Sequence, residues 1–167
     1  MSDKKIRKLV ISALMAALVC VATMVVRIPT PTNGYVNLGD CVVLLRGWLL
    51  GPWWGGAAAG IGSMLTDLFA GYTSFAPGTF LIKGLMAVMA YFLYIAMKKS
   101  SAGAIVSGVA AELWMAGGYF VYEALALQYG IGAAVGIPSN LVQGAVGLVV
   151  GFILLKIFQK AHIAEKI

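Results

Sequence analysis

One stretch constrains the fold of this chain more than any other: an apolar run over residues 103–127 that contains two carboxylates. About 25 residues are enough for a helix to cross the core of a bilayer. Within the run, Glu112, Tyr119 and Glu123 are spaced so that they share one helical face. A charged group inside a membrane helix costs roughly 2.5–3.5 kcal/mol and usually faces protein or a water-filled cavity. The run predicts a transmembrane helix with a ligand-binding face; pairing of the acids with a neighbouring Lys or Arg is the alternative.

Composition places the whole chain in a lipid bilayer. Of its 167 residues, 61% are apolar and only 11% are charged, whereas a soluble domain carries about 25% charged residues. The net charge of +6 comes from basic residues at the ends of apolar runs, which does not indicate nucleic-acid binding. Cys20, Cys41 and the single His162 form no metal-ligand or catalytic pattern, so we expect no metal, no cofactor and no enzymatic activity.

The basic residues also predict the topology. Nine of the twelve Lys and Arg residues lie in clusters at 4–8, 98–99 and 156–166. Because cytoplasmic loops carry the excess of positive charge, an even number of spans must separate each pair of clusters. The region 40–70 then contributes two short spans around its central Pro-Gly turn. The sequence predicts a single-domain, all-α membrane protein over residues 1–167, with both termini cytoplasmic and six transmembrane helices at about 9–27, 40–53, 56–70, 79–97, 103–127 and 137–158.

Under this topology nearly every polar side chain within the membrane lies in its extracellular half. Glu112 is the exception and lies deeper, while the cytoplasmic half is lined by small and aliphatic residues. This distribution favours a solute site open to the outside over a continuous polar channel. An ion pair between Asp67 and Lys83 is a structural alternative for those two residues. The predicted ligand-binding residues are Asn33, Tyr35, Asn37, Asp40, Asp67, Lys83, Glu112, Tyr119, Glu123, Asn140 and Gln143.

Two further features concern the helix surfaces. Ala13 and Ala17 are one turn apart on the first predicted helix and form a small-xxx-small surface, against which another membrane helix can pack closely. Trp48, Trp53 and Trp54 are more typical of interface anchors than of ligand contacts.

A series of motifs resembles a known family over the whole chain. The motifs lie at residues 35–40 (YVNLGD), 51–52 (GP), 67–72 (DLFAGY), 76–77 (AP) and 81–84 (LIKG). In this order and spacing they resemble the substrate-binding S component of energy-coupling factor (ECF) vitamin transporters, in the riboflavin, hydroxymethylpyrimidine and pyridoxine branch. The small-residue surface of the first helix agrees with that resemblance.

The resemblance implies high-affinity capture of a vitamin at the plasma membrane of a prokaryote. It implies assembly with a membrane-embedded coupling (T) protein, which would contact Ala13 and Ala17, and through it with two ABC-type ATPase subunits. It also implies that the loop after the first helix and the outer parts of the fourth to sixth helices form the pocket. The chain has no G-x-x-x-x-G-K-[ST] loop of its own, so the energy of ATP must come from partners.

The residue types favour a small, flat, hydrogen-bonding heteroaromatic ligand, because aromatic rings can stack on its faces while polar groups contact its edge. Pyridoxine or hydroxymethylpyrimidine fits this description, with riboflavin next. The alternatives are a stand-alone small-solute channel or multidrug exporter, and a membrane-embedded enzyme that uses Glu112 and Glu123. A channel would need polar residues through its full depth, and an enzyme would need a nucleophile or a metal cluster.

Overall fold

The computed structural model describes residues 3–162, and its first helix leads directly into a short hairpin. Helix α1 covers Asp3–Val25. Strand β1 (Arg27–Pro29) pairs antiparallel with β2 (Tyr35–Asn37). The turn between them is closed by Asn33, which has a positive φ of 56° and donates its backbone N–H to the carbonyl of Thr30. This β-hairpin corrects the all-α prediction, which treated residues 27–39 as a loop.

Two short helices form the centre of the molecule. Helix α2 (Gly39–Leu50) is buried from Gly39 to Trp48, as expected for a helix that is apolar on all sides. Helix α3 (Pro52–Ala70) begins one residue later, with proline in its first turn. Gly51 joins the two helices with a φ of 83°, a conformation that favours glycine. The two helices predicted here are present, but the turn predicted at Pro52 and residues 55–56 lies at Gly51 instead, because α3 already begins at Pro52.

Three long helices and a helical connection complete the described part of the chain. Helix α4 covers Ala76–Ala96 and α5 covers Ser101–Leu125. The glycine-rich link that follows folds as a 3-10 helix, η1 (Gly130–Gly136), and continues directly into α6 (Ile137–Lys160). The two helices that the charge pattern placed between the second and third basic clusters are thus α5 and α6.

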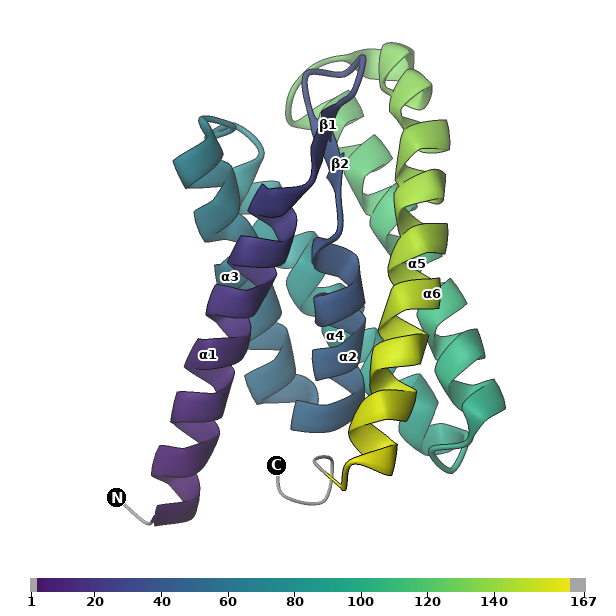
Figure 1. Cartoon of the computed structure of the whole chain (residues 1–167). Helices are drawn as coiled ribbons and strands as arrows, with labels where there is room; N and C mark the ends of the chain where they lie inside the picture. Colours follow the sequence, from purple (N-terminus) through teal and green to yellow (C-terminus); the bar gives the residue numbers. More distant parts are fainter. Residues whose placement is uncertain (1–2, 163–167) are drawn as a thin grey trace.

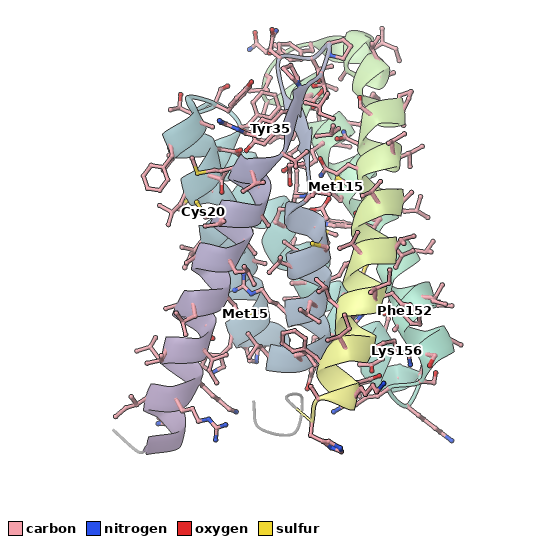
Figure 2. All side chains as sticks on the ribbon, viewed as in Figure 1. Met15, Cys20, Tyr35, Met115, Phe152 and Lys156 are labelled. Atoms are coloured by element: carbon pink, nitrogen blue, oxygen red, sulfur yellow. The ribbon has the colours of Figure 1, made fainter. Side chains whose placement is uncertain are left out.

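The arrangement separates two ends of the bundle (Figure 1). Helix α2 lies inside and packs against α1, α3, α4 and α6. The β-hairpin and η1 lie at one end, and the start of α1, the α4–α5 turn and the end of α6 lie at the other. Figure 2 shows Tyr35 at the hairpin end and Lys156 near the opposite end. The described residues of the three basic clusters therefore lie at the end away from the hairpin.

The six predicted helices are all present, but four of them qualify as membrane spans by length and composition. Within the described residues these are α1, α4, α5 and α6 together with η1. Helix α2 has only 12 residues, and the glycine- and alanine-rich α3 is also absent from this set. That α2 and α3 cross the membrane stays a prediction, as does the cytoplasmic side of the termini, whose last residues lie outside the described part of the chain.

Candidate ligand-binding site

A small polar cavity lies beneath the β-hairpin. Its volume is about 30 Å³, which is room for about one or two water molecules. Ligand pockets are typically about 300–1,000 Å³, so the cavity in this conformation is too small for a vitamin-sized ligand. Its walls come from α1, the hairpin, α3, the start of α4, α5 and α6. The cavity is lined by Thr23, Thr30, Gly34, Tyr35, Asn37, Ser63, Asp67, Phe75, Thr79, Lys83, Tyr119, Glu123, Asn140 and Gln143.

The hairpin closes the cavity through side chains of β2. The Tyr35 hydroxyl donates a 2.6 Å hydrogen bond to Asp67 Oδ1. The Tyr35 ring lies 4.7 Å from that of Tyr72, centre to centre, just beyond the end of α3. Burial, followed by the charge of Asp67, raises the pKa of Tyr35, so its hydroxyl remains a donor at physiological pH. The hairpin is thus attached to α3 by one strong polar contact and one aromatic contact.

A chain of hydrogen bonds continues from the hairpin into the core. The backbone N–H of Asn37 donates to Gln143 Oε1 on α6 at 2.7 Å. The Gln143 amide then donates through Nε2 to Asp40 Oδ2 at 2.6 Å. Asp40 forms an ion pair with Lys83 of α4, and both side chains are almost completely buried. Residues of β2, α2, α4 and α6 therefore meet at one polar floor.

Asp40 reaches this position because it lies in the first turn of α2, where the helix dipole stabilises a carboxylate. Its pairing with Lys83 corrects the alternative of an Asp67–Lys83 ion pair. Lys83 Nζ also lies 5.5 Å from the centre of the Tyr119 ring, close enough for a cation–π contact. The Tyr119 hydroxyl is held by Thr79 at 3.0 Å.

Two carboxylates in the cavity wall keep acceptor capacity unused. Among the described residues, one oxygen of Asp67 (Oδ2) and one of Glu123 (Oε2) are buried and have no hydrogen-bond partner. A side chain added at Gly136 would lie 3.3 Å from Glu123 Oε2 and 3.2 Å from Thr32 Oγ1, so this carboxylate lies between α5, η1 and the hairpin. Buried acceptors normally find a donor. The closed cavity therefore has two acceptors available to a ligand that carries N–H or O–H groups.

Glu112 lies behind the cavity and does not line it. Both of its oxygens are buried without a partner in the described part of the chain. A Cβ at Gly147 would lie 2.7 Å from Asp40 Cβ and 2.9 Å from Glu112 Oε1, so the two acids pack against the same point of α6. Glu112 is therefore part of the polar floor rather than an isolated deep residue. It forms no ion pair within residues 3–162, so the alternative of a buried pair does not apply to it there.

The structure brings together most of the predicted ligand-binding residues. Asp40 lies beneath the cavity rather than in its wall, and Asn33 is exposed at the hairpin turn, away from the cavity. Trp48, predicted as an interface anchor, is instead buried and donates to Ser107. The predicted residues that line the cavity are Tyr35, Asn37, Asp67, Lys83, Tyr119, Glu123, Asn140 and Gln143.

The sequence-based prediction does not include several residues of the cavity wall, among them Thr23, Ser63, Phe75 and Thr79. Thr23 and Ser63 are single hydroxyl residues within apolar helices, which carry no distinctive pattern. Thr79 lies one turn before Lys83 on α4, and that spacing could have indicated it. Phe75 immediately precedes α4, where an aromatic residue is indistinguishable from an interface anchor.

Comparison with solved structures defines the class of fold. The S component of a bacterial ECF transporter superposes with a TM-score of 0.76 at 24% sequence identity, over 95% of this chain and 98% of that one. The S component for biotin from an ECF-type ABC transporter gives a TM-score of 0.52 at 16% identity, over 93% and 95% of the two chains. The fold is that of ECF S components.

Sequence comparison then gives the family. The family model described as ECF-type riboflavin transporter, S component, matches residues 3–160. The chain belongs to this family of vitamin-transporter substrate-binding components, and it is not an enzyme. It is also 40% identical over 136 residues to a protein of Pyrococcus woesei that is described as an uncharacterized protein in gap 3'region. The aligned residues cover 80% of this chain and 88% of that protein.

Proposed function

We propose that this protein is the high-affinity substrate-binding subunit of an ATP-driven ECF-type vitamin importer. The observation that carries the proposal is the closed polar cavity under the β-hairpin, in a chain of this family. Its polar groups converge from six parts of the chain at one end of the bundle. The floor beneath it is sealed by the Asp40–Lys83 pair and by apolar packing around Met86 and Met115. This is the arrangement of a site loaded from one side.

The cavity favours a small ligand that donates hydrogen bonds. Lys83 is committed to Asp40, whereas Asp67 and Glu123 each have a buried oxygen without a donor among the described residues. A ligand with hydroxymethyl, amino or protonated ring nitrogen groups would satisfy both acceptors, and its ring could contact Tyr119 or Phe75. Pyridoxine or hydroxymethylpyrimidine fits this chemistry and requires less expansion of the cavity than riboflavin does. Riboflavin is next, and the name of the matching family makes it the essential third compound to test.

Entry of any such ligand requires the hairpin to move. The cavity volume of about 30 Å³ is below that of a vitamin-sized site. The contacts that hold the hairpin down are few, chiefly Tyr35 with Asp67 and Asn37 with Gln143. Both involve residues of the cavity wall. A ligand that bonds to Asp67 or Gln143 would therefore compete with hairpin contacts on entry and re-form them around itself.

Import would depend on partners, as the lack of a nucleotide-binding loop in the sequence predicts. We propose that a membrane coupling protein docks on α1 at Ala13 and Ala17, and that two ABC-type ATPase subunits act through it. Both alanines line an apolar groove of about 580 Å³ between α1 and α3, which could accept a helix. Ala13→Trp combined with Ala17→Trp should abolish uptake in cells while leaving vitamin binding by the purified subunit unchanged. Normal uptake by the double variant would refute the docking site.

The ligand-binding residues are tested by calorimetry on the purified subunit. Pyridoxine, hydroxymethylpyrimidine and riboflavin would be titrated into wild type, Glu123→Gln and Asn140→Ala. Loss of a charge-assisted hydrogen bond costs about 1.5–3 kcal/mol, so Glu123→Gln should weaken binding roughly 10- to 150-fold. Gln128→Glu, beyond the end of α5, is a matched control that changes charge at a residue outside the cavity wall. Equal affinity in Glu123→Gln and wild type would remove Glu123 from the site.

A further inference from the structure

A second cavity lies at the end of the bundle opposite the hairpin. It has a volume of about 440 Å³ and lies between the start of α1, the α2–α3 turn, α4 and the α4–α5 turn. Lys8 and Lys99 contribute ammonium groups from two different elements, and Trp53, Trp54 and Tyr91 contribute aromatic rings. We refer to the space lined by these five residues as the basic cavity.

The basic cavity adjoins the apolar groove between α1 and α3. The two spaces share Ser12 and Trp54 in their linings. The groove follows α1 from Leu9 to Val21, which is roughly 18 Å at the rise of an α-helix. One leaflet is about half of the ~30 Å hydrocarbon core. The combined space is therefore polar and basic at one end and apolar for about the depth of a leaflet.

One buried polar group of the basic cavity, the Ser12 hydroxyl, lacks a hydrogen-bond partner among the described residues. Ser12 is 5% exposed, and its hydroxyl has no partner there. Arg46 of α2 is also fully buried, and none of its guanidinium nitrogens is bonded within the same residues, but it lies outside the cavity lining. No acidic side chain of residues 3–162 lines either space. The first turn of α3, the positive end of its dipole, also borders the cavity at Trp53.

We propose that an anionic phospholipid occupies this combined space, with its phosphate in the basic cavity and an acyl chain along the α1–α3 groove. The phosphate accepts hydrogen bonds from Lys8, from Lys99 and from the Ser12 hydroxyl, which has no partner among the described residues. Trp53 and Trp54 contact the headgroup region, where tryptophan is favoured. The acyl chain of the lipid lies on the apolar surface that includes Ala13 and Ala17. If the proposed coupling-protein docking is correct, this lipid covers the docking surface of the free subunit and leaves when the partner binds.

Lipid retention by the purified full chain tests the proposal. The chain would be incubated in detergent with equal amounts of phosphatidylglycerol and phosphatidylcholine, and bound lipid would be counted by native mass spectrometry. We expect one phosphatidylglycerol to be retained in preference to phosphatidylcholine. Each lysine near a charged headgroup contributes roughly a fivefold affinity difference, so Lys8→Gln with Lys99→Gln should weaken retention about 30-fold. Lys98→Gln is the matched control, because Lys98 adjoins Lys99 but lies outside the cavity lining.

Two further arms separate a lipid from a soluble anion and from the vitamin site. Ala57 is exposed in the groove, so Ala57→Phe should obstruct the acyl chain without disturbing the core. This variant should retain less phosphatidylglycerol than wild type. Glycerol phosphate should protect neither wild type nor Ala57→Phe against thermal unfolding. Three results would each overturn the proposal. These are equal retention of phosphatidylglycerol and phosphatidylcholine, equal phosphatidylglycerol retention by Lys98→Gln and the double lysine variant, and protection by glycerol phosphate alone. Vitamin titrations on the same variants should be unchanged, which keeps this test independent of the proposed function.

Discussion

The buried ion pair between Asp40 and Lys83 provides the sharpest test of how the cavity floor is built. The two side chains are 0% and 3% exposed, so removal of one partner leaves the other charge buried. Such a loss typically costs about 3–5 kcal/mol. In Lys83→Met, Asp40 keeps its 2.6 Å hydrogen bond from Gln143, which places the expected cost near the lower limit of about 3 kcal/mol.

The double variant distinguishes an uncompensated charge from lost packing. In Lys83→Met with Asp40→Asn, the ion pair is replaced by neutral side chains, and the amide introduced at position 40 can still accept a hydrogen bond from Gln143. Replacement of a buried pair by neutral groups is often neutral or stabilising, so the double variant should be more stable than Lys83→Met alone.

Thermal unfolding of the detergent-purified subunit measures both effects. At roughly 2–4 °C per kcal/mol for a chain of this length, Lys83→Met should lower the midpoint by about 6–12 °C. The double variant should recover at least half of that loss. Lys98→Met, at the exposed end of α4, should change the midpoint by less than about 2 °C. A double variant less stable than either single variant would refute the charge-burial argument.

Three further predictions concern the hairpin contact and helix packing. Below pH 10, Tyr35 is protonated in both the folded and the unfolded state. Above pH 10 the unfolded state loses the proton first, so the stability of the protein falls as pH rises. Between pH 10 and 12 the unfolding midpoint should therefore fall less steeply with pH in Tyr35→Phe than in wild type. Tyr35→Phe should also lower stability at pH 7 by about 1–3 kcal/mol, measured by denaturant titration, because the bond to Asp67 is lost; an unchanged midpoint at pH 7 would mean that this bond does not hold the hairpin. Gly147→Ala should destabilise the folded protein by about 1–3 kcal/mol, because its Cβ would crowd the Asp40 side chain at 2.7 Å. Gly117→Ala has open space around it and should be neutral or stabilising by up to about 1 kcal/mol. Thermal scans that rank the two variants in reverse order would contradict the packing.

Helix number was predictable because charge and breakers act along the chain. The basic clusters require an even number of helices between them, and the helix-breaking residues Pro52, Gly55 and Gly56 predict two short helices in the central region. The face that carries Glu112, Tyr119 and Glu123 follows from helical periodicity alone, and the structure confirms that Glu112 and Glu123 are buried.

Partner choice and strand formation were not predictable, for physical reasons. The rise per residue gives the depth of a side chain along its helix, but not the rotation of the helix or the identity of its neighbour. Depth alone therefore favours Asp67 as the partner of Lys83, whereas the structure pairs Lys83 with Asp40. Strand β1 has three residues and ends in proline, so it shows neither the length nor the alternation of a strand. The hairpin forms because tertiary contacts of Tyr35 and Asn37 hold β2 in place.

The central claim is that this subunit alone captures a vitamin in the cavity beneath the hairpin. The most direct measurement is mass spectrometry of small molecules released from the detergent-purified chain, followed by calorimetry with the compound found. We predict stoichiometric release of one pyridine, pyrimidine or flavin vitamin and tight rebinding that Glu123→Gln weakens. No released compound and no binding of pyridoxine, hydroxymethylpyrimidine or riboflavin would contradict the account and favour a stand-alone channel or exporter.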